Sequence, residues 1–122
     1  MKFLAVGAVA ASSLVAMASA DLLQMHSPYP GTVWTAGENM TVSWFGNCKK
    51  MGKVGRKVPV DLVTGPASAV RYVATLGHIN CAGTNINAKF VIPVDIDNGP
   101  YALIVRTTPQ PSYTDTFQIE GL

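Results

Sequence analysis

The segment MTVSWF, residues 40–45, alternates apolar and polar side chains with a period of two. Met40, Val42 and Trp44 fall on one face, and Thr41 and Ser43 fall on the other, which is typical of a half-buried β-strand. Similar patterns predict six further strands, over residues 22–26, 57–63, 69–76, 88–94, 101–107 and 113–120. No apolar period of 3.6 residues persists over a dozen positions after residue 20, so the sequence indicates an all-β protein.

The alternation also predicts which side chains face the interior. In residues 57–63 we expect Asp61 to point outward, and in residues 69–76 we expect Tyr72 to point inward. Pro59 has no N–H to donate to a neighbouring strand, so we expect its strand to have an exposed edge near its start.

Turn-forming residues separate the predicted strands at fairly regular intervals, among them Pro30-Gly31, Gly65-Pro66 and Asn98-Gly99-Pro100. Seven short strands in a chain of this length predict an antiparallel β-sandwich of the immunoglobulin or fibronectin III type. Tyr101 follows a tight turn and opens a strand, which is the position of the tyrosine in the tyrosine corner of such sandwiches. A simple core aromatic explains the same position equally well.

Residues 1–20 have the features of a cleaved secretory signal peptide. Lys2 precedes an apolar run from Phe3 to Ala18, and Ala18-Ser19-Ala20 fits the small-residue pattern before a cleavage site. A membrane anchor is the alternative, but the run is shorter than the roughly 20 apolar residues that cross a bilayer. We therefore expect residues 21–122 to form one secreted, immunoglobulin-like domain that lacks a transmembrane segment.

The balance of charge excludes one class of partner. The chain has 9 Lys and Arg against 7 Asp and Glu, a formal net charge of +2, and loss of Lys2 with the leader lowers it to +1. A protein so close to neutral is not a general binder of polyanions. We therefore expect no nucleic-acid partner.

Two cysteines, Cys48 and Cys81, are the only ones in the sequence. An even number of cysteines in a secreted chain predicts a disulfide, and two cysteines allow only one pairing. A metal-binding pair or a redox pair is the alternative. Both are disfavoured because the sequence has no CxxC motif and no nearby cluster of histidines.

Few residues in the sequence suggest a catalytic or metal-binding site. The sequence contains neither GxSxG nor HExxH, and its two histidines, His26 and His78, adjoin turn residues. Asp95 and Asp97 precede a turn and are best explained as turn caps, with a loose Ca²⁺ contact as the alternative. We therefore predict a protein that is not an enzyme and that uses no cofactor and no metal.

The one uneven feature of charge is CKKMGKVGRK, residues 48–57. This basic loop holds five of the eight Lys and Arg residues that remain after the leader: Lys49, Lys50, Lys53, Arg56 and Lys57. A solvated loop is the simplest interpretation. The alternative is a contact surface for an acidic wall polysaccharide or an anionic membrane face.

Two further features relate to carbohydrate. Tyr29, Trp34, Tyr72 and Tyr113 are candidates for stacking on sugar rings, with Tyr29 and Trp34 preferred, and packing in or around the core is the alternative. Asn39 begins an Asn-Met-Thr sequon for N-glycosylation. It shares the outward face of the predicted strand, so a glycan there would be solvated.

Four segments together resemble a known family of fungal proteins. They are SPYPGTVWTAGENMTVSW (residues 27–44), VPVDLVTGP (58–66), FVIPVDIDNGPYALIV (90–105) and SYTDTFQIEG (112–121). The pattern is similar to the N-terminal domain of fungal cell-wall β-1,6-glucan assembly proteins, a domain also present in the Ser/Thr-rich GPI-anchored membrane protein family. The resemblance covers nearly all of residues 21–122.

The resemblance implies a secreted β-sandwich module associated with the fungal cell wall, whose partner is a wall polysaccharide such as glucan or a wall glycoprotein. It implies no catalytic residue. Many family members continue into a Ser/Thr-rich stalk and a GPI signal, whereas this sequence ends directly after its last predicted strand. We therefore expect a free or loosely wall-retained protein. A small secreted effector or inhibitor that binds a protein through its loops is the second hypothesis, and an enzyme of wall remodelling is the third.

Overall fold

The computed structural model describes residues 22–122, so the predicted signal peptide and its cleavage site lie outside the described residues. This part of the chain forms nine strands and two 3-10 helices: β1 (Leu23–Ser27), β2 (Val33–Thr35), β3 (Asn39–Gly46), η2 (Lys49–Arg56), β4 (Val58–Thr64), η3 (Ala67–Ala69), β5 (Arg71–Ile79), β6 (Asn87–Val91), β7 (Gly99–Val105), β8 (Ser112–Tyr113) and β9 (Phe117–Glu120). Within residues 22–122, no helix has the length and apolar character needed to cross a bilayer.

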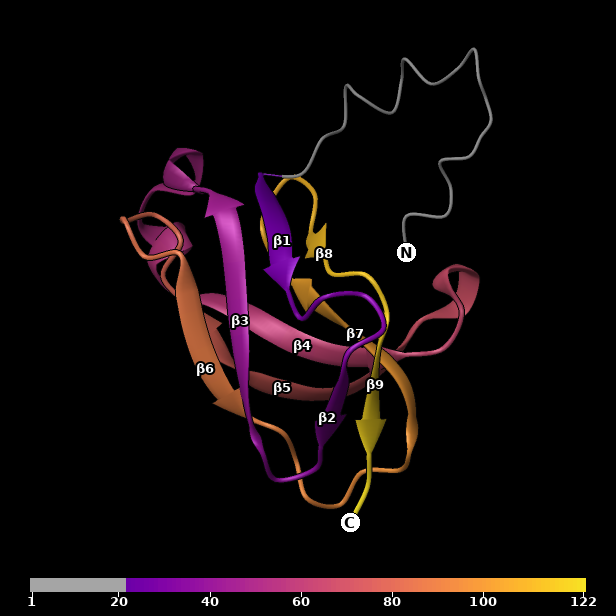
Figure 1. Ribbon diagram of the computed structural model, residues 1–122. Helices are drawn as coiled ribbons and strands as arrows, with labels where there is room; N and C mark the ends of the chain where they lie inside the picture. The colour runs from indigo at the N-terminus through magenta and orange to yellow at the C-terminus, as the bar shows by residue number, and fades with distance from the viewer. Residues whose placement is uncertain (1–21) are drawn as a thin grey trace.

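The strands form two layers (Figure 1). One sheet has the order β1-β3-β6, and the other has the order β2-β9-β7-β4-β5, with the short strand β8 also paired to β7. All pairs are antiparallel except that of β2 with β9. In Figure 1, β4 and β5 cross behind β3 and β6. This arrangement confirms the predicted sandwich of the immunoglobulin or fibronectin III type.

The described chain has two more strands than the seven that the sequence predicts. β2 is only three residues long, and it exists because it pairs in parallel with β9, more than 80 residues later in the sequence. The predicted strand over residues 113–120 is divided in two: β8 pairs with one end of β7, and β9 pairs with the other. Both differences arise from long-range pairing, which a local pattern does not reveal.

The core is built from the predicted alternating residues. Met40, Val42 and Trp44 of β3 are buried, and they pack in one cluster with buried residues of both sheets: Leu23, Val58, Val60, Leu62, Ile79, Phe90, Leu103, Val105, Phe117 and Ile119. Each such large side chain stabilises the fold by roughly 1.5–3 kcal/mol through its removal from water. The indole N–H of Trp44 has no hydrogen-bond partner among residues 22–122, so its contribution comes from packing.

The prediction that Tyr72 points inward is wrong, because β5 is irregular. Its register against β4 shifts twice: Leu62 pairs with Ala74 but Val63 pairs with Tyr72, and a second shift lies between Val60 and Asp61. Each shift leaves one extra residue in β5, which is a β-bulge. The two extra residues, Val73 and Leu76, pack against the core. Tyr72 consequently lies on the outer face, with 61% of its surface exposed.

The prediction of an exposed edge at Pro59 holds only in part: β4 lies between β5 and β7, but its pairing with β7 does not include Val58 or Pro59. Pro59 lies just before Val60, the residue at which pairing with β7 begins. Its carbonyl oxygen accepts a hydrogen bond of 3.0 Å from the Arg106 N–H. The missing N–H of proline therefore falls where the ladder with β7 stops.

Tyr101 forms a tyrosine corner. It is buried near the start of β7, and its hydroxyl donates a hydrogen bond of 2.7 Å to the carbonyl oxygen of Asp97, four residues earlier. Burial is the main cause that raises the pKa of the Tyr101 phenol above its ordinary value; the charge of Asp97 raises this pKa as well, and Arg71 lowers it. The bond fixes the β6–β7 connection against the core, which distinguishes this tyrosine from a simple core aromatic.

We predict that Tyr101→Phe lowers the free energy of unfolding by about 1 kcal/mol at neutral pH, because one buried hydrogen bond is lost. The folded pKa of Tyr101 lies above the unfolded value of about 10. Its contribution to stability is therefore complete below pH ~10 and is lost as the pH rises through the folded pKa. Urea denaturation of both proteins at neutral pH and above pH 10 measures this. A variant as stable as the wild type at neutral pH would contradict the corner's role.

Candidate functional site

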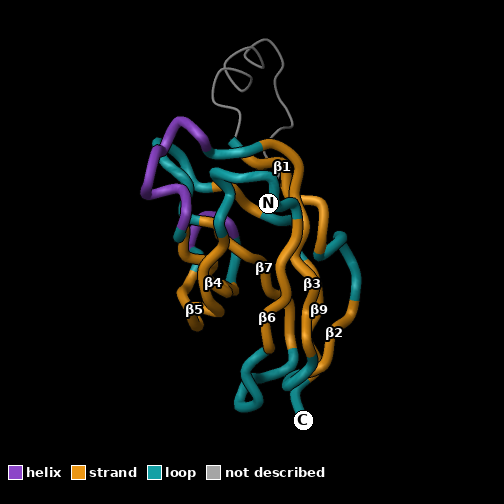
Figure 2. The backbone as a smooth tube through the Cα atoms, turned by 90° about the vertical axis from the view of Figure 1, so that its left-hand side faces the viewer, coloured by secondary structure: helices purple, strands orange, loops and turns teal. Residues whose placement is uncertain are grey.

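The basic loop folds into η2, at the end of the sandwich where β1 begins and β3 ends (Figures 1 and 2). Its two helical turns are separated by a kink at Gly52, which has a φ of 64° and a ψ of −138°. A residue with a side chain rarely adopts this positive φ, so glycine permits the change of direction. The kink therefore changes the direction of the chain in the middle of the basic loop.

A disulfide between Cys48 and Cys81 holds this loop in place, as the sequence predicts. It joins the start of η2 to the connection between β5 and β6, and the two Cα atoms are 5.3 Å apart. Backbone hydrogen bonds reinforce it: the Cys48 N–H donates to the Cys81 carbonyl oxygen at 2.8 Å, and the Cys81 N–H donates to that of Gly55 at 3.0 Å.

Gly55 shows how closely this region is packed. It is buried, and a Cβ atom placed on it would lie 2.8 Å from the Cys48 sulfur and 3.0 Å from the Cys48 carbonyl oxygen. Real Cβ atoms essentially never approach another heavy atom so closely, so any larger residue would displace the disulfide or the loop. The sequence places glycine at the one position where η2 must touch the disulfide.

A hollow of about 430 Å³ lies beside this clamp, and we call it the basic hollow. It is open to solvent and is lined by residues of η2 and of the β5–β6 connection: Lys49, Gly52, Lys53, Arg56, Asn80, Ala82 and Gly83. Of the seven predicted contact residues, five of them cationic, Lys49, Lys53 and Arg56 therefore converge on one surface. Lys50 and Lys57 are exposed but do not line the hollow.

The electrostatics of the basic hollow are one-sided. Three of its seven lining residues are cationic and none is acidic, while Asn80 adds an amide. The Asn80 carbonyl oxygen of the side chain accepts a hydrogen bond of 3.1 Å from the Ala82 N–H, which fixes its orientation in the connection. Ammonium, guanidinium and amide groups donate hydrogen bonds, so the hollow is suited to an anionic ligand such as a carboxylate or a phosphate.

The two preferred stacking residues, Tyr29 and Trp34, have different surroundings. The His26 ring contacts both Tyr29 and Phe45, with ring centroids 4.9 Å apart for His26–Tyr29 and 5.1 Å apart for His26–Phe45. The Tyr29 hydroxyl and the His26 Nε2 are hydrogen-bonded at 2.8 Å. Trp34 is half-buried against the core, and its indole N–H donates to the Thr32 hydroxyl at 3.2 Å. Alternation alone did not identify Phe45, because it is the outward residue at the end of its strand.

The predicted glycosylation site and the two predicted turn aspartates lie at exposed positions. Asn39 is exposed at the start of β3, so its side chain is accessible to a glycan, and its glycosylation stays a prediction. Asp95 and Asp97 are exposed on the β6–β7 connection. Across residues 22–122, no group of three or more His, Cys, Asp or Glu side chains is placed to hold a metal ion.

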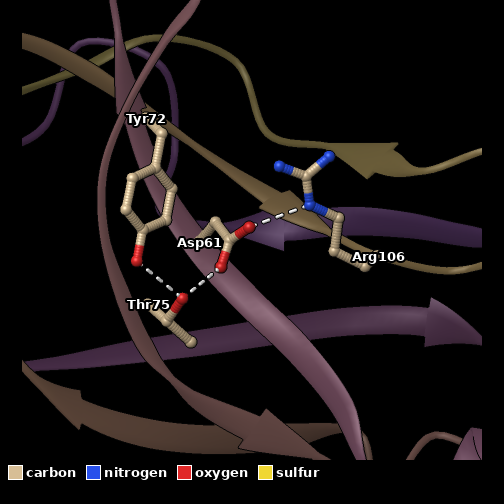
Figure 3. Close-up of polar contacts among 4 residues, drawn as sticks. All are labelled: Asp61, Tyr72, Thr75 and Arg106. Atoms are coloured by element: carbon tan, nitrogen blue, oxygen red, sulfur yellow. Dashed lines mark hydrogen bonds and ion pairs between the residues drawn. The ribbon is translucent and has the colours of Figure 1, made fainter.

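A polar network occupies the outer face of the larger sheet (Figure 3). Asp61 points away from the core, as predicted, yet it is buried, with only 6% of its surface exposed. One carboxylate oxygen accepts a hydrogen bond of 2.8 Å from the Thr75 hydroxyl, and the other pairs with the Arg106 Nε at 2.8 Å. The Tyr72 hydroxyl lies 3.0 Å from that of Thr75. No local pattern in the sequence predicts this network, because its members meet only through strand pairing.

We predict that replacing both cysteines by alanine lowers the free energy of unfolding by about 3–4 kcal/mol, because the disulfide closes a loop with a sequence separation of 33 residues. Reversible urea denaturation of the double variant and of the wild type measures the difference. A loss below about 1 kcal/mol would mean that the backbone hydrogen bonds around Cys48 hold the loop by themselves.

The comparisons with known proteins give information about the fold only. No protein-family model matches the sequence, and no curated protein sequence matches it. Among solved structures, the chain is similar to fibronectin(III)-like modules of CbhA from Clostridium thermocellum, with 13% identity and a TM-score of 0.41 over 81% of this chain and 93% of that chain. It is also similar to a DUF4784 family protein from Bacteroides caccae, with 8% identity and a TM-score of 0.47 over 81% of this chain and 23% of that chain. Identities this low say nothing of a shared activity.

Proposed function

We propose that this chain is a secreted, non-enzymatic module of the fungal cell wall that binds a wall polysaccharide, with the basic hollow as the contact for its acidic groups. The fungal and extracellular setting rests on the sequence resemblance and on the predicted signal peptide. The observation that carries the binding role is the convergence of Lys49, Lys53 and Arg56 on one hollow.

The residue types favour a ligand with carboxylate or phosphate groups. Arg56 offers a planar guanidinium that can donate two parallel hydrogen bonds to one carboxylate, whereas Lys49 and Lys53 offer compact charges on flexible stems. A polysaccharide presents such groups at intervals, so several weak contacts add along one chain. Contacts of this kind weaken as salt rises, because exposed charges are screened.

The rigid backbone beneath the hollow supports the same role. The disulfide and the hydrogen bonds at Cys48 and Cys81 fix the loop before any ligand arrives. A site that is already ordered loses less conformational entropy on binding, and this increases affinity. A merely solvated basic loop needs no such clamp.

The non-enzymatic assignment is supported by the chemistry of the hollow. Hydrolysis of a glycoside ordinarily requires two carboxyl groups facing each other across the bond that breaks. None of the seven residues that line the hollow carries a carboxyl group. The groups present donate hydrogen bonds and hold charge, which are the properties of a binding surface.

A protein partner is the second candidate. The hollow is formed by two connections at one end of the sandwich, and immunoglobulin-like domains commonly bind proteins through such loops. Chemical crosslinking in the presence of wall extracts distinguishes the candidates, because a protein partner gives a crosslinked band that survives digestion of glycans.

Two matched double variants test the proposal. Lys53→Ser with Arg56→Ser removes two charges from the hollow, and Lys50→Ser with Lys57→Ser removes two charges from the same loop outside it. We expect the first pair to weaken binding to a soluble polyuronate about tenfold, which corresponds to about 1.4 kcal/mol. We expect the second pair to weaken binding much less, because it lowers the positive charge of the loop but removes no group that lines the hollow. Affinity electrophoresis or calorimetry at low salt measures both.

Equal losses from the two pairs would show that net charge, not the hollow, governs binding. Absence of binding by the wild-type protein to polyuronate, phosphorylated mannan, β-glucan and chitin alike would remove the proposal.

A further inference from the structure

We infer that the outer face of the larger sheet carries a second binding site, centred on Tyr72 and Arg106, which takes uncharged sugar rings of a polysaccharide. The inference rests on the proposed function for the class of ligand, but it concerns residues from β4, β5, β7 and β8 and from the chain just after β7, none of which lines the basic hollow. The strand register, the direction of the hydrogen bonds and the local charge carry it.

The bulges in β5 create this surface. Tyr72 and Thr75 are three residues apart, so a regular strand would point them to opposite faces. The register shift between Leu62 and Val63 leaves Val73 as the extra residue and turns Tyr72 to the outer face. Tyr72 then shares that face with Thr75 and Asp61, as Figure 3 shows. Bulges commonly re-aim a side chain beside a functional site.

The directions of the hydrogen bonds follow from the groups involved. An ionised Asp61 only accepts, so the single proton of the Thr75 hydroxyl points to Asp61 at 2.8 Å. The Tyr72 hydroxyl must then donate its own proton to Thr75. The Tyr72 ring is held by this chain of bonds with its phenol oxygen left to accept and most of its surface open to solvent.

Arg106 supplies the complementary donors. Its Nε–H is used by Asp61 at 2.8 Å, and the two terminal nitrogens of the guanidinium, which carry four more N–H groups, extend beyond this contact (Figure 3). The side chain is 45% exposed, so these donors can reach a ligand. Asp61 and Arg106 neutralise each other, so the pair adds no net charge to this face, which fits an uncharged ligand rich in hydroxyl groups.

The register extends the site across four strands. Tyr113 of β8 pairs with Ile104 of β7, Ile104 pairs with Asp61 of β4, and Asp61 pairs with Thr75 of β5. Neighbouring strands are about 4.8 Å apart, so Tyr113 and Thr75 are anchored about 14 Å from each other. Tyr113 is 39% exposed. Two tyrosines thus flank the Asp61–Arg106 pair, and the apolar cluster of Val63, Ala102 and Ile104 lies buried beside it.

This arrangement fits an extended neutral polysaccharide laid across the strands. The apolar C–H face of a sugar ring can pack on the exposed face of Tyr72 or Tyr113, as aromatic side chains combine apolar area with a polar tip. The sugar hydroxyls can accept hydrogen bonds from Arg106 between the two rings. A surface with a few placed polar groups among apolar ones orients a ligand as well as holding it.

The test uses retention of the purified protein on insoluble neutral β-glucan, with a polyuronate titration as a parallel measurement. We expect Tyr72→Ala and Tyr113→Ala each to weaken retention on β-glucan about tenfold while leaving polyuronate binding unchanged. Tyr72→Phe keeps the ring and should retain most of the binding. Val91→Ala, an exposed apolar residue of β6 on the other sheet, is the matched control and should have no effect. Since all three side chains are exposed in whole or in part, these variants are expected to fold.

Retention on β-glucan that is unchanged in both alanine variants would overturn the site, and so would a wild-type protein that binds polyuronate but not β-glucan; the proposed function would stand in that second case. A loss of retention in Val91→Ala equal to that in Tyr72→Ala would also overturn it. Binding of neither polymer would overturn this inference, and it would remove the proposed function as well if phosphorylated mannan and chitin also failed to bind.

Discussion

The covalent link between Cys48 and Cys81 is the constraint on which the binding end of the molecule depends. The segment containing η2 carries the chain from β3 in one sheet to β4 in the other, and the β5–β6 connection carries it back. The disulfide therefore joins two of the connections that cross between the layers. Hydrogen bonds from Cys48 to Cys81 and from Cys81 to Gly55 add a second, non-covalent clamp. Without the disulfide and these hydrogen bonds, a loop with two glycines and five cations would be flexible, and its cations would not be held on one surface.

The two candidate surfaces differ in charge and in origin. The basic hollow is cationic and is built from connections, whereas the outer sheet face pairs Asp61 with Arg106 and is built on strands. Strand β5 links them, because it runs from Tyr72 on the outer face to Ile79, immediately before Asn80 in the hollow. One polysaccharide with both charged and uncharged units could contact both surfaces, which would raise affinity beyond that of either alone.

Much of the fold could be predicted from the sequence, because alternation within β3, β6 and β9 directly records which face is buried. The disulfide followed from counting cysteines, and the tyrosine corner at Tyr101 was one of two interpretations that its position allowed. The bulges of β5 could not be predicted, since a bulge is defined by its partner strand and not by local pattern. The basic loop is a second example: its five cations are visible in the sequence, but which of them line the hollow depends on the fold of η2 and of the β5–β6 connection.

The central claim is that the basic hollow binds acidic groups of a polysaccharide, and chemical-shift mapping by NMR tests it most directly. An isotope-labelled protein is titrated with a short oligouronate at low salt. The account predicts that the largest shifts cluster at Lys49, Lys53, Arg56, Asn80 and Gly83, and that they disappear when the disulfide is reduced. Chemical-shift changes spread evenly over all exposed lysines would contradict this claim. Changes concentrated on strands outside the hollow would contradict it as well.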